Sequence, residues 1–251
     1  MKEQYSELAK AYDNLMYDVP YKEWAQYILR LIEKYGGVEK APVEILECAC
    51  GTGNITLELL RAGLEVVGVD IEHEMLNIAA GKLRKNAVSA QLVCADMVEF
   101  KLNKPVDAVV CACDGVNYVL TEERLQLFFA NTYGNMKEKG IFLFDISSEY
   151  KLNEILGDNF YFDDADDQTV FWQNSIDKKR SAITMELVLF IKTGDCYTRQ
   201  DERHVQHVWK IQEIVRMLEQ AGFSDVKAYG FGTELPSMPE DERIQFVAIK
   251  E

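Results

Sequence analysis

The stretch VEILECACGTGN, residues 43–54, decides the fold of this 251-residue chain. Its first half is an apolar run of strand length, and its second half is a turn of small residues that leads into a helical pattern over residues 54–61. Gly51 and Gly53 permit backbone angles that side chains exclude, and they let a ligand approach the main chain. A strand, a glycine turn and a helix in this order are typical of the ligand-binding edge of a doubly wound α/β sheet.

The sequence on either side continues this alternation. Apolar runs of strand length occupy residues 65–69, 91–94, 106–112, 141–146, 226–229 and 244–249. Helical spacing of apolar residues covers residues 72–83, 122–133 and 211–220. We therefore expect a mostly parallel, seven-stranded α/β sheet with helices on both faces. Two amphipathic helices, broken near Pro20, are predicted between Tyr5 and Tyr35.

The pattern changes between residues 150 and 208. Extended segments at residues 170–176, 181–191 and 197–208 are separated by turn sequences, which predicts an inserted antiparallel sheet of about three strands. The acidic run DDADD, residues 163–167, is interpreted as a solvated loop. The predicted division is a core of residues 1–149 and 209–251 and an inserted antiparallel β subdomain of residues 150–208.

Composition restricts the partners. Acidic residues outnumber basic ones 42 to 27, and a net charge of -15 disfavours binding to a nucleic-acid backbone. No apolar run reaches 18 residues and the first residues lack the apolar core of a signal peptide, so we expect a soluble cytoplasmic protein, with no membrane partner, that is a monomer or a homodimer. The Cys-Ala-Cys spacing at residues 48–50 and 111–113 does not suit zinc, so no metal site is predicted.

Asp70 narrows the choice of ligand. It ends the strand that follows the glycine turn, where a carboxylate can accept hydrogen bonds from both hydroxyls of a ribose. The dinucleotide fingerprint would require a small residue at the position of Thr56, and the carboxylate of Glu47 would face a pyrophosphate. A nucleoside-containing cofactor with a positive charge suits these residues better.

With these features the sequence resembles the class I S-adenosylmethionine-dependent methyltransferases, and specifically small bacterial members that carry an antiparallel sheet inserted after the fifth strand. The likeness spans nearly the whole chain. One departure is Ala49, which stands where the family usually has glycine. The segments that carry the resemblance are residues 45–53, 67–76, 94–97, 113–118, 140–145 and 218–223.

The resemblance implies S-adenosyl-L-methionine as cofactor and assigns it a set of residues. Glu47 would lie near the methionyl amino group, Asp70 at the ribose and Asp96 at the adenine amine. The N-terminal aromatic residues would cover the cofactor. The full set of implied cofactor-binding residues is Tyr5, Tyr12, Trp24, Glu47, Cys48, Ala49, Gly51, Gly53, Asp70, Ile71, Met75, Asp96, Met97, Cys113 and Asp114.

The implied reaction is methyl transfer to a small-molecule acceptor by in-line displacement. Because alignment alone can supply most of the rate enhancement, no catalytic base is assigned. Tyr12, Asp145 and His204 are weak candidates for a catalytic role, and His204 and His207 would point to opposite faces of one strand. Two alternatives stay open: a methyltransferase-fold scaffold that binds the cofactor without transfer, and a nicotinamide-dependent oxidoreductase.

Overall fold

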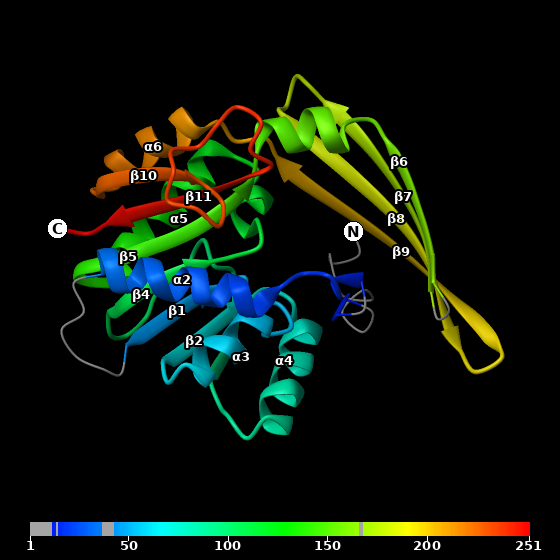
Figure 1. The fold of residues 1–251 in the computed structure, drawn as a ribbon, viewed down its shortest axis with the longest axis horizontal. Coiled ribbons are helices and arrows are strands. Elements are labelled where there is room, and N and C mark those ends of the chain that lie inside the picture. The colour runs from blue at the N-terminus through cyan, green and yellow to red at the C-terminus, as the bar shows by residue number, and fades with distance from the viewer. Residues whose placement is uncertain (1–11, 14, 37–42, 166–167) are drawn as a thin grey trace.

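A computed structural model describes residues 12–13, 15–36, 43–165 and 168–251 (Figure 1). Of the first predicted helix, only residues 12, 13 and 15 are described in helical conformation, and Tyr5 lies outside the described residues. No helix among the described residues has the length and apolarity needed to cross a bilayer. The elements are α2 (Tyr21–Tyr35), β1 (Glu44–Cys48), α3 (Asn54–Arg61), β2 (Glu65–Asp70), α4 (His73–Lys85), β3 (Gln91–Cys94), β4 (Val106–Cys111), η1 (Gly115–Tyr118), α5 (Glu122–Asn135), β5 (Met136–Ser147), η2 (Lys151–Leu156), β6 (Phe160–Ala165), β7 (Gln168–Asp177), β8 (Ala182–Thr193), β9 (Cys196–His207), α6 (Ile211–Gln220), β10 (Ser224–Gly230) and β11 (Arg243–Ile249).

The larger sheet has seven strands in the order β10-β11-β5-β4-β1-β2-β3. The five strands from β3 to β5 run parallel, and β11 lies antiparallel between β5 and β10. This confirms the predicted doubly wound, mostly parallel sheet. Because the order reverses at β1 and β4, the carboxyl ends of these strands open a crevice in which such sheets bind ligands.

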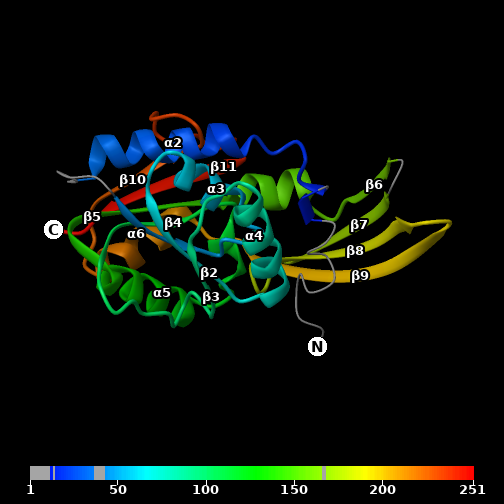
Figure 2. The ribbon, with the colours of Figure 1, turned by 90° about the horizontal axis from the view of Figure 1, so that it is seen from below.

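Helices cover both faces of this sheet (Figure 2). On one face, α2 and α3 bury Leu31 and Leu59 against the inner strands, and on the other α5 and α6 bury Phe128 and Met217. The central strands are buried on both faces, as parallel strands between two helical layers must be. This rigid centre fixes the strand ends at which the candidate site lies.

A second sheet of four antiparallel strands, in the order β6-β7-β8-β9, projects beside the first (Figure 1). The sequence predicted about three strands where four form. It also predicted a solvated loop at residues 163–167, which is wrong for residues 163–165; residues 166–167 lie outside the described residues. Asp163 and Asp164 belong to β6, where they pair with Val170 and Thr169 of β7. All six residues of β6 are exposed, so an edge strand accommodates the acidic side chains without burying them.

One buried side chain lies where the segment that carries the four-stranded sheet leaves the core and where it returns. Asn117, in η1, has no exposed surface. Its Oδ1 accepts from the Ser147 amide at 3.0 Å, and its Nδ2 donates to the carbonyls of Ser147 at 3.2 Å and His207 at 3.0 Å. Ser147 ends β5 and His207 ends β9, so a single amide holds the chain where it leaves the core and where it returns.

Candidate functional site

The turn after β1 adopts three left-handed backbone conformations, at Ala49 (φ 53°), Gly51 (φ 54°) and Gly53 (φ 74°). The Cys50 amide donates to the Val69 carbonyl at 3.0 Å, which ties the turn to β2. An alanine in this conformation costs roughly 1–2 kcal/mol, because its Cβ crowds the following carbonyl. Ala49 therefore adopts a backbone conformation that glycine adopts more easily, at the expense of local strain.

Gly115 provides the space for the extra methyl group of Ala49. A Cβ atom added at Gly115 would lie 3.1 Å from the Cβ of Ala49 and 2.8 Å from the Sγ of Cys111. The residues just before it, Cys113 and Asp114, also have positive φ, at 59° and 50°. Two tight turns thus meet closely where β1 and β4 end.

Asp70 lies at the end of β2, beside the turn. Its Oδ2 accepts from the Gly51 amide at 2.7 Å, and its Oδ1 accepts from the Glu72 amide at 2.9 Å. Burial raises the pKa of Asp70 above its ordinary value, and these amide hydrogen bonds oppose that shift. Each carboxylate oxygen retains a second lone pair, so Asp70 can still accept two hydrogen bonds from a ligand diol.

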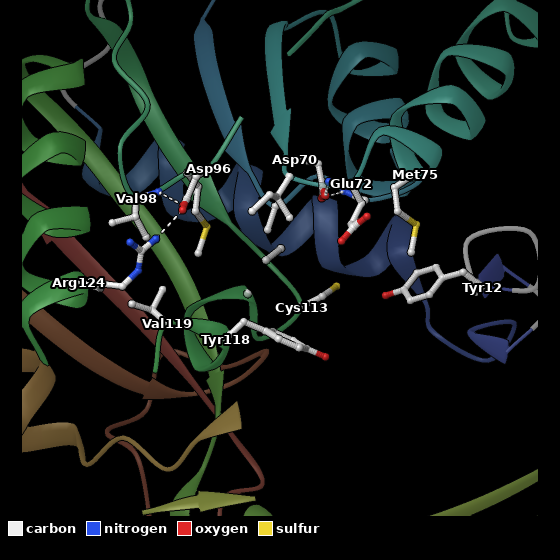
Figure 3. A pocket seen from close by; sticks show the side chains of 16 residues that line it. Tyr12, Asp70, Glu72, Met75, Asp96, Val98, Cys113, Tyr118, Val119 and Arg124 are labelled. Carbon is white, nitrogen blue, oxygen red and sulfur yellow. Dashed lines mark hydrogen bonds and ion pairs between the residues drawn. The ribbon is translucent and has the colours of Figure 1, made fainter. Parts of the chain in front are cut away.

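A cavity runs along these strand ends (Figure 3). Asp96 and Arg124 lie at one end of it, Tyr12 lies at the other, and Asp70 lies between them. Nine of the residues expected to bind cofactor line the cavity: Tyr12, Ala49, Gly51, Asp70, Ile71, Met75, Asp96, Met97 and Cys113. Five of the remaining expected residues do not line it: Trp24, Glu47, Cys48, Gly53 and Asp114.

Ile71 makes the cavity wall unusual. Its side chain is 63% exposed, whereas its neighbours Asp70 and Glu72 are buried. Met75, also on this wall, is only 2% exposed. A large apolar side chain that is exposed beside a carboxylate is the surface that a flat, apolar ring would cover.

The opposite end of the cavity is polar. Asp96 follows β3; its Oδ1 accepts from the Val98 amide at 2.9 Å, and its Oδ2 lies 2.5 Å from Arg124 Nη2. Arg124 lies in the first turn of α5. It was not identified from the sequence, because a lone arginine on a helix has no distinguishing pattern. An amine bound at Asp96 would have to share its carboxylate with this guanidinium.

Glu47 points into the core instead of the cavity. Its Oε2 accepts from the Thr56 hydroxyl at 2.5 Å, and its side chain is 3% exposed. Burial raises the pKa of Glu47 to about 8, although the hydrogen bond from Thr56 favours the ionised form. Thr56, which stands where a dinucleotide site needs a small residue, is therefore the partner that holds this acid.

Arg243 joins two carboxylates at the ends of β4 and β5. Its Nη2 lies 2.7 Å from Asp114 Oδ1, and its Nη1 pairs with Asp145 Oδ2. Asp145 also accepts from the amides of Cys113 at 2.8 Å and Asp114 at 3.0 Å. Trp24 stacks on Arg243, with the guanidinium carbon 5.0 Å from the ring centroid, which explains why Trp24 lies outside the cavity.

The pKa values of the two carboxyls shift in opposite directions. Burial opposes ionisation of Asp114, but the charge of Arg243 outweighs it and lowers the pKa of Asp114 below its ordinary value. Burial raises the pKa of Asp145 in spite of Arg243. Asp114 Oδ2 also accepts from Gln206 Nε2 at 2.6 Å. Both carboxylates are thus engaged by fixed partners, which favours a structural role for Asp145.

His204 and His207 lie on opposite faces of β9, as their spacing predicts. His204 is 3% exposed and contacts Tyr118 edge to face, with ring centroids 6.1 Å apart. Burial lowers the pKa of His204 to about 4 and also lowers the pKa of His207, whose ring lies against Trp209. His204 is therefore a neutral imidazole. It does not line the cavity but contacts Tyr118, which does.

Several cavity residues escaped sequence reasoning. Most of them are apolar or belong to no recognisable motif. Only their position after the end of a strand could have marked them as residues of the site. They are Glu72, Val98, Ala112, Gly115, Tyr118, Val119 and Arg124.

Comparison with known proteins agrees with this geometry. Residues 45–140 match a family described as "Methyltransferase domain". The chain is 31% identical to "Putative methyltransferase YqeM" of Bacillus subtilis, over 98% of this chain and 97% of the relative. It is 30% identical to "Putative methyltransferase GWCH70_2453" of a Geobacillus species, over 98% and 99%.

A solved structure is similar over the same length. The crystal structure of an S-adenosylmethionine-dependent methyltransferase from Clostridium acetobutylicum superposes with a TM-score of 0.88 at 29% identity, over 98% of each chain. The seven-stranded sheet, the strand-end cavity and these full-length similarities agree. The chain therefore belongs to the class I S-adenosylmethionine-dependent methyltransferases.

Proposed function

We propose that the chain binds S-adenosyl-L-methionine in the strand-end cavity and transfers its methyl group, by in-line displacement, to a small-molecule acceptor. The observation that carries this proposal is the pairing of Asp70 with Ile71. Asp70 keeps two acceptor lone pairs for a ribose diol, and the exposed Ile71 beside it offers an uncovered apolar surface to an adenine ring. One nucleoside satisfies both residues at once.

The other residues of the cavity fit the same ligand. The amides around Ala49 and Gly51 would approach the methionyl end, and Met75 and Met97 would enclose the adenine. Asp96 would accept from the adenine amine while it shares its charge with Arg124. A bound ligand with a positive charge nearby would lower the raised pKa of the buried Glu47, which Thr56 holds, and so favour its ionised form.

Bound S-adenosylmethionine supplies a sulfonium methyl group that is electrophilic without further activation. The task left to the protein is to exclude water and to orient the acceptor. Tyr12 lies at the end of the cavity away from Asp96, and Cys113 and Tyr118 lie across the cavity from Asp70 (Figure 3). Tyr118 also contacts His204 of β9. Orientation of this kind supplies roughly 7–11 kcal/mol of barrier reduction in favourable cases.

Where the acceptor must lose a proton, His204 is a candidate base that burial weakens, because a pKa lowered to about 4 makes its imidazole a poor base near neutral pH. Asp114 and Asp145 are held by Arg243, so neither has the freedom of a general base. His204 is neutral because of burial, and its contact with Tyr118 links it to the cavity wall.

Isothermal titration with S-adenosylmethionine and S-adenosylhomocysteine tests the binding step. Micromolar affinity in the wild-type protein and a loss of about 100-fold in Asp70→Ala are expected, because two charge-assisted hydrogen bonds disappear. Glu65→Ala, at the far end of the same strand, is the matched control and should bind as the wild type does. No binding of either ligand at millimolar concentration refutes the proposal.

The transfer step needs its own test. Incubation with methyl-labelled cofactor and a panel of amines, phenols, carboxylates and small-molecule cell extract should label an acceptor. Tight cofactor binding without any transfer would favour the scaffold alternative instead. A thermal shift with nicotinamide dinucleotides and none with S-adenosylhomocysteine would favour the oxidoreductase.

A further inference from the structure

Asp13 makes an unusual set of contacts for a residue near the start of the chain. Its Oδ1 accepts from the Thr52 hydroxyl at 2.7 Å and from Asn54 Nδ2 at 3.0 Å. Its Oδ2 lies 2.8 Å from Lys82 Nζ. Lys82, on α4, also donates to Thr52 Oγ1 at 3.2 Å and to Asn54 Oδ1. One carboxylate thus joins the N-terminal segment to the glycine turn and to α4.

These contacts explain the polar residues of the glycine turn. Thr52 is 1% exposed, and neither Thr52 nor Asn54 lines the cavity. The turn therefore has two functional sides. Ala49 and Gly51 face the cavity, while Thr52 and Asn54 bind Asp13.

The residue next to Asp13 lines the cavity. Tyr12 forms its end wall opposite Asp96, with its hydroxyl directed toward Cys113 (Figure 3). Tyr12 and Leu15 also pack against Val170 and Leu189 on the four-stranded sheet. The short segment that includes Asp13 therefore contacts the glycine turn, the cavity and the second sheet together.

We propose that Asp13 is a positioning residue that holds Tyr12 against the cavity, so that retention of the cofactor depends on the contacts of Asp13 with Thr52, Asn54 and Lys82. This inference rests on the proposed function, because it requires the cofactor to occupy the cavity. Tyr12 packs on the second sheet as well, and the fixed position of Asp13 beside it keeps its ring at the cavity wall. The same turn that receives the cofactor on one side secures its cover on the other.

Electrostatics support a permanent attachment. Burial alone would raise the pKa of Asp13, but the hydrogen bonds from Lys82, Thr52 and Asn54 outweigh it and lower that pKa. Side-chain exposure is 39% for Asp13 and 17% for Lys82, so water screens the pair only in part. The attachment consequently persists across the neutral pH range.

The test is a stopped-flow measurement of S-adenosylhomocysteine release, made on wild type, Asp13→Asn, Tyr12→Ala and the double variant. Asp13→Asn should release the ligand about tenfold faster, because the neutral amide weakens the charge-assisted hydrogen bonds that the carboxylate makes. If Asp13 acts through Tyr12, the double variant should release no faster than Tyr12→Ala alone. The exchange Asp13→Lys with Lys82→Asp should restore slow release in part.

Asp107→Asn is the matched control. Asp107 binds Lys137 at 3.0 Å and the Glu44 amide at 2.8 Å, at the other end of the sheet, so its loss should leave release unchanged. Wild-type release rates in Asp13→Asn, or effects that multiply in the double variant, would overturn the inference alone. Absence of ligand binding by the wild-type protein would overturn the proposed function, and the inference with it.

Discussion

Replacement of Arg243 by alanine should destabilise the protein strongly. Arg243 pairs with Asp114 and Asp145, and the exposed fractions of the three side chains are only 16%, 19% and 2%. Without the guanidinium, two buried carboxylates face each other, and of the charges that act on Asp114 the cation of Lys151 remains. Removal of one partner from a buried ion pair costs about 3–5 kcal/mol, because the remaining charge stays desolvated. For a chain of this size the melting temperature should fall by roughly 6–20 °C.

The loss should depend on pH in a defined direction. Arg243 now lowers the pKa of Asp114 and opposes the effect of burial on Asp145. In the variant, the pKa values of both carboxyls in the folded state rise above their unfolded values. The folded variant then gains protons as pH falls, so the difference in unfolding free energy from wild type should shrink between pH 7.5 and pH 5.

Urea unfolding followed by tryptophan fluorescence measures this difference at both pH values. Arg216→Ala is the control, because Arg216 forms an exposed pair with Glu122 at 2.8 Å and should cost no more than about 1 kcal/mol. A loss below 1 kcal/mol in Arg243→Ala, or a loss that is the same at pH 5 and pH 7.5, would refute the reasoning.

Three further variants probe other features of the site. Burial raises the pKa of Glu47 to about 8, against an ordinary value of 4.5. Because Glu47 keeps its proton in the folded state but loses it in the unfolded state, the free energy of unfolding of the cofactor-free protein should fall by roughly 1.4 kcal/mol per pH unit as pH rises toward 8. Glu47→Gln should remove that slope in thermal denaturation between pH 6 and pH 9, and an unchanged slope would contradict the assignment. Gly115→Ala should cost about 1–3 kcal/mol in urea unfolding because its Cβ would meet Cys111 and Ala49, whereas Gly134→Ala, with open space on α5, should gain about 1 kcal/mol. His204→Gln should lower kcat for an acceptor that must lose a proton, while the affinity for S-adenosylhomocysteine in titration stays within about twofold. The pKa of His204 is lowered to about 4, so the wild-type pH–rate profile should show no limb near pH 6.5 that depends on His204. A limb near pH 6.5 that disappears in this variant would contradict a neutral imidazole.

The sequence was sufficient to predict the larger sheet because its strands are buried on both faces and read as continuous apolar runs. The run at β4 is an example. The sequence was insufficient to predict β6, because the acidic residues Asp163 and Asp164 are typical of a loop. An edge strand exposed on both faces needs no apolar alternation, so period alone could not reveal it.

The candidate site divides in the same way. Asp70, Asp96 and Cys113 were found because side chains at the ends of parallel strands must gather at one edge of the sheet. The role expected for Trp24 could not be judged from helical spacing, since its orientation depends on Phe231 and Arg243, more than 200 residues later in the chain. Whether these residues bind the cofactor remains a prediction for the titrations above.

The position of Asn117 has a consequence for how proteins of this shape diversify. Its side chain holds Ser147 and His207 together, so about sixty residues leave and rejoin the core at a single clamped point. We expect that changes in length or sequence within β6 to β9 leave Ser147 and His207 in place, because Asn117 holds both. On this expectation, the sheet of β6 to β9 can differ between related proteins while the strands that support the cavity keep their positions.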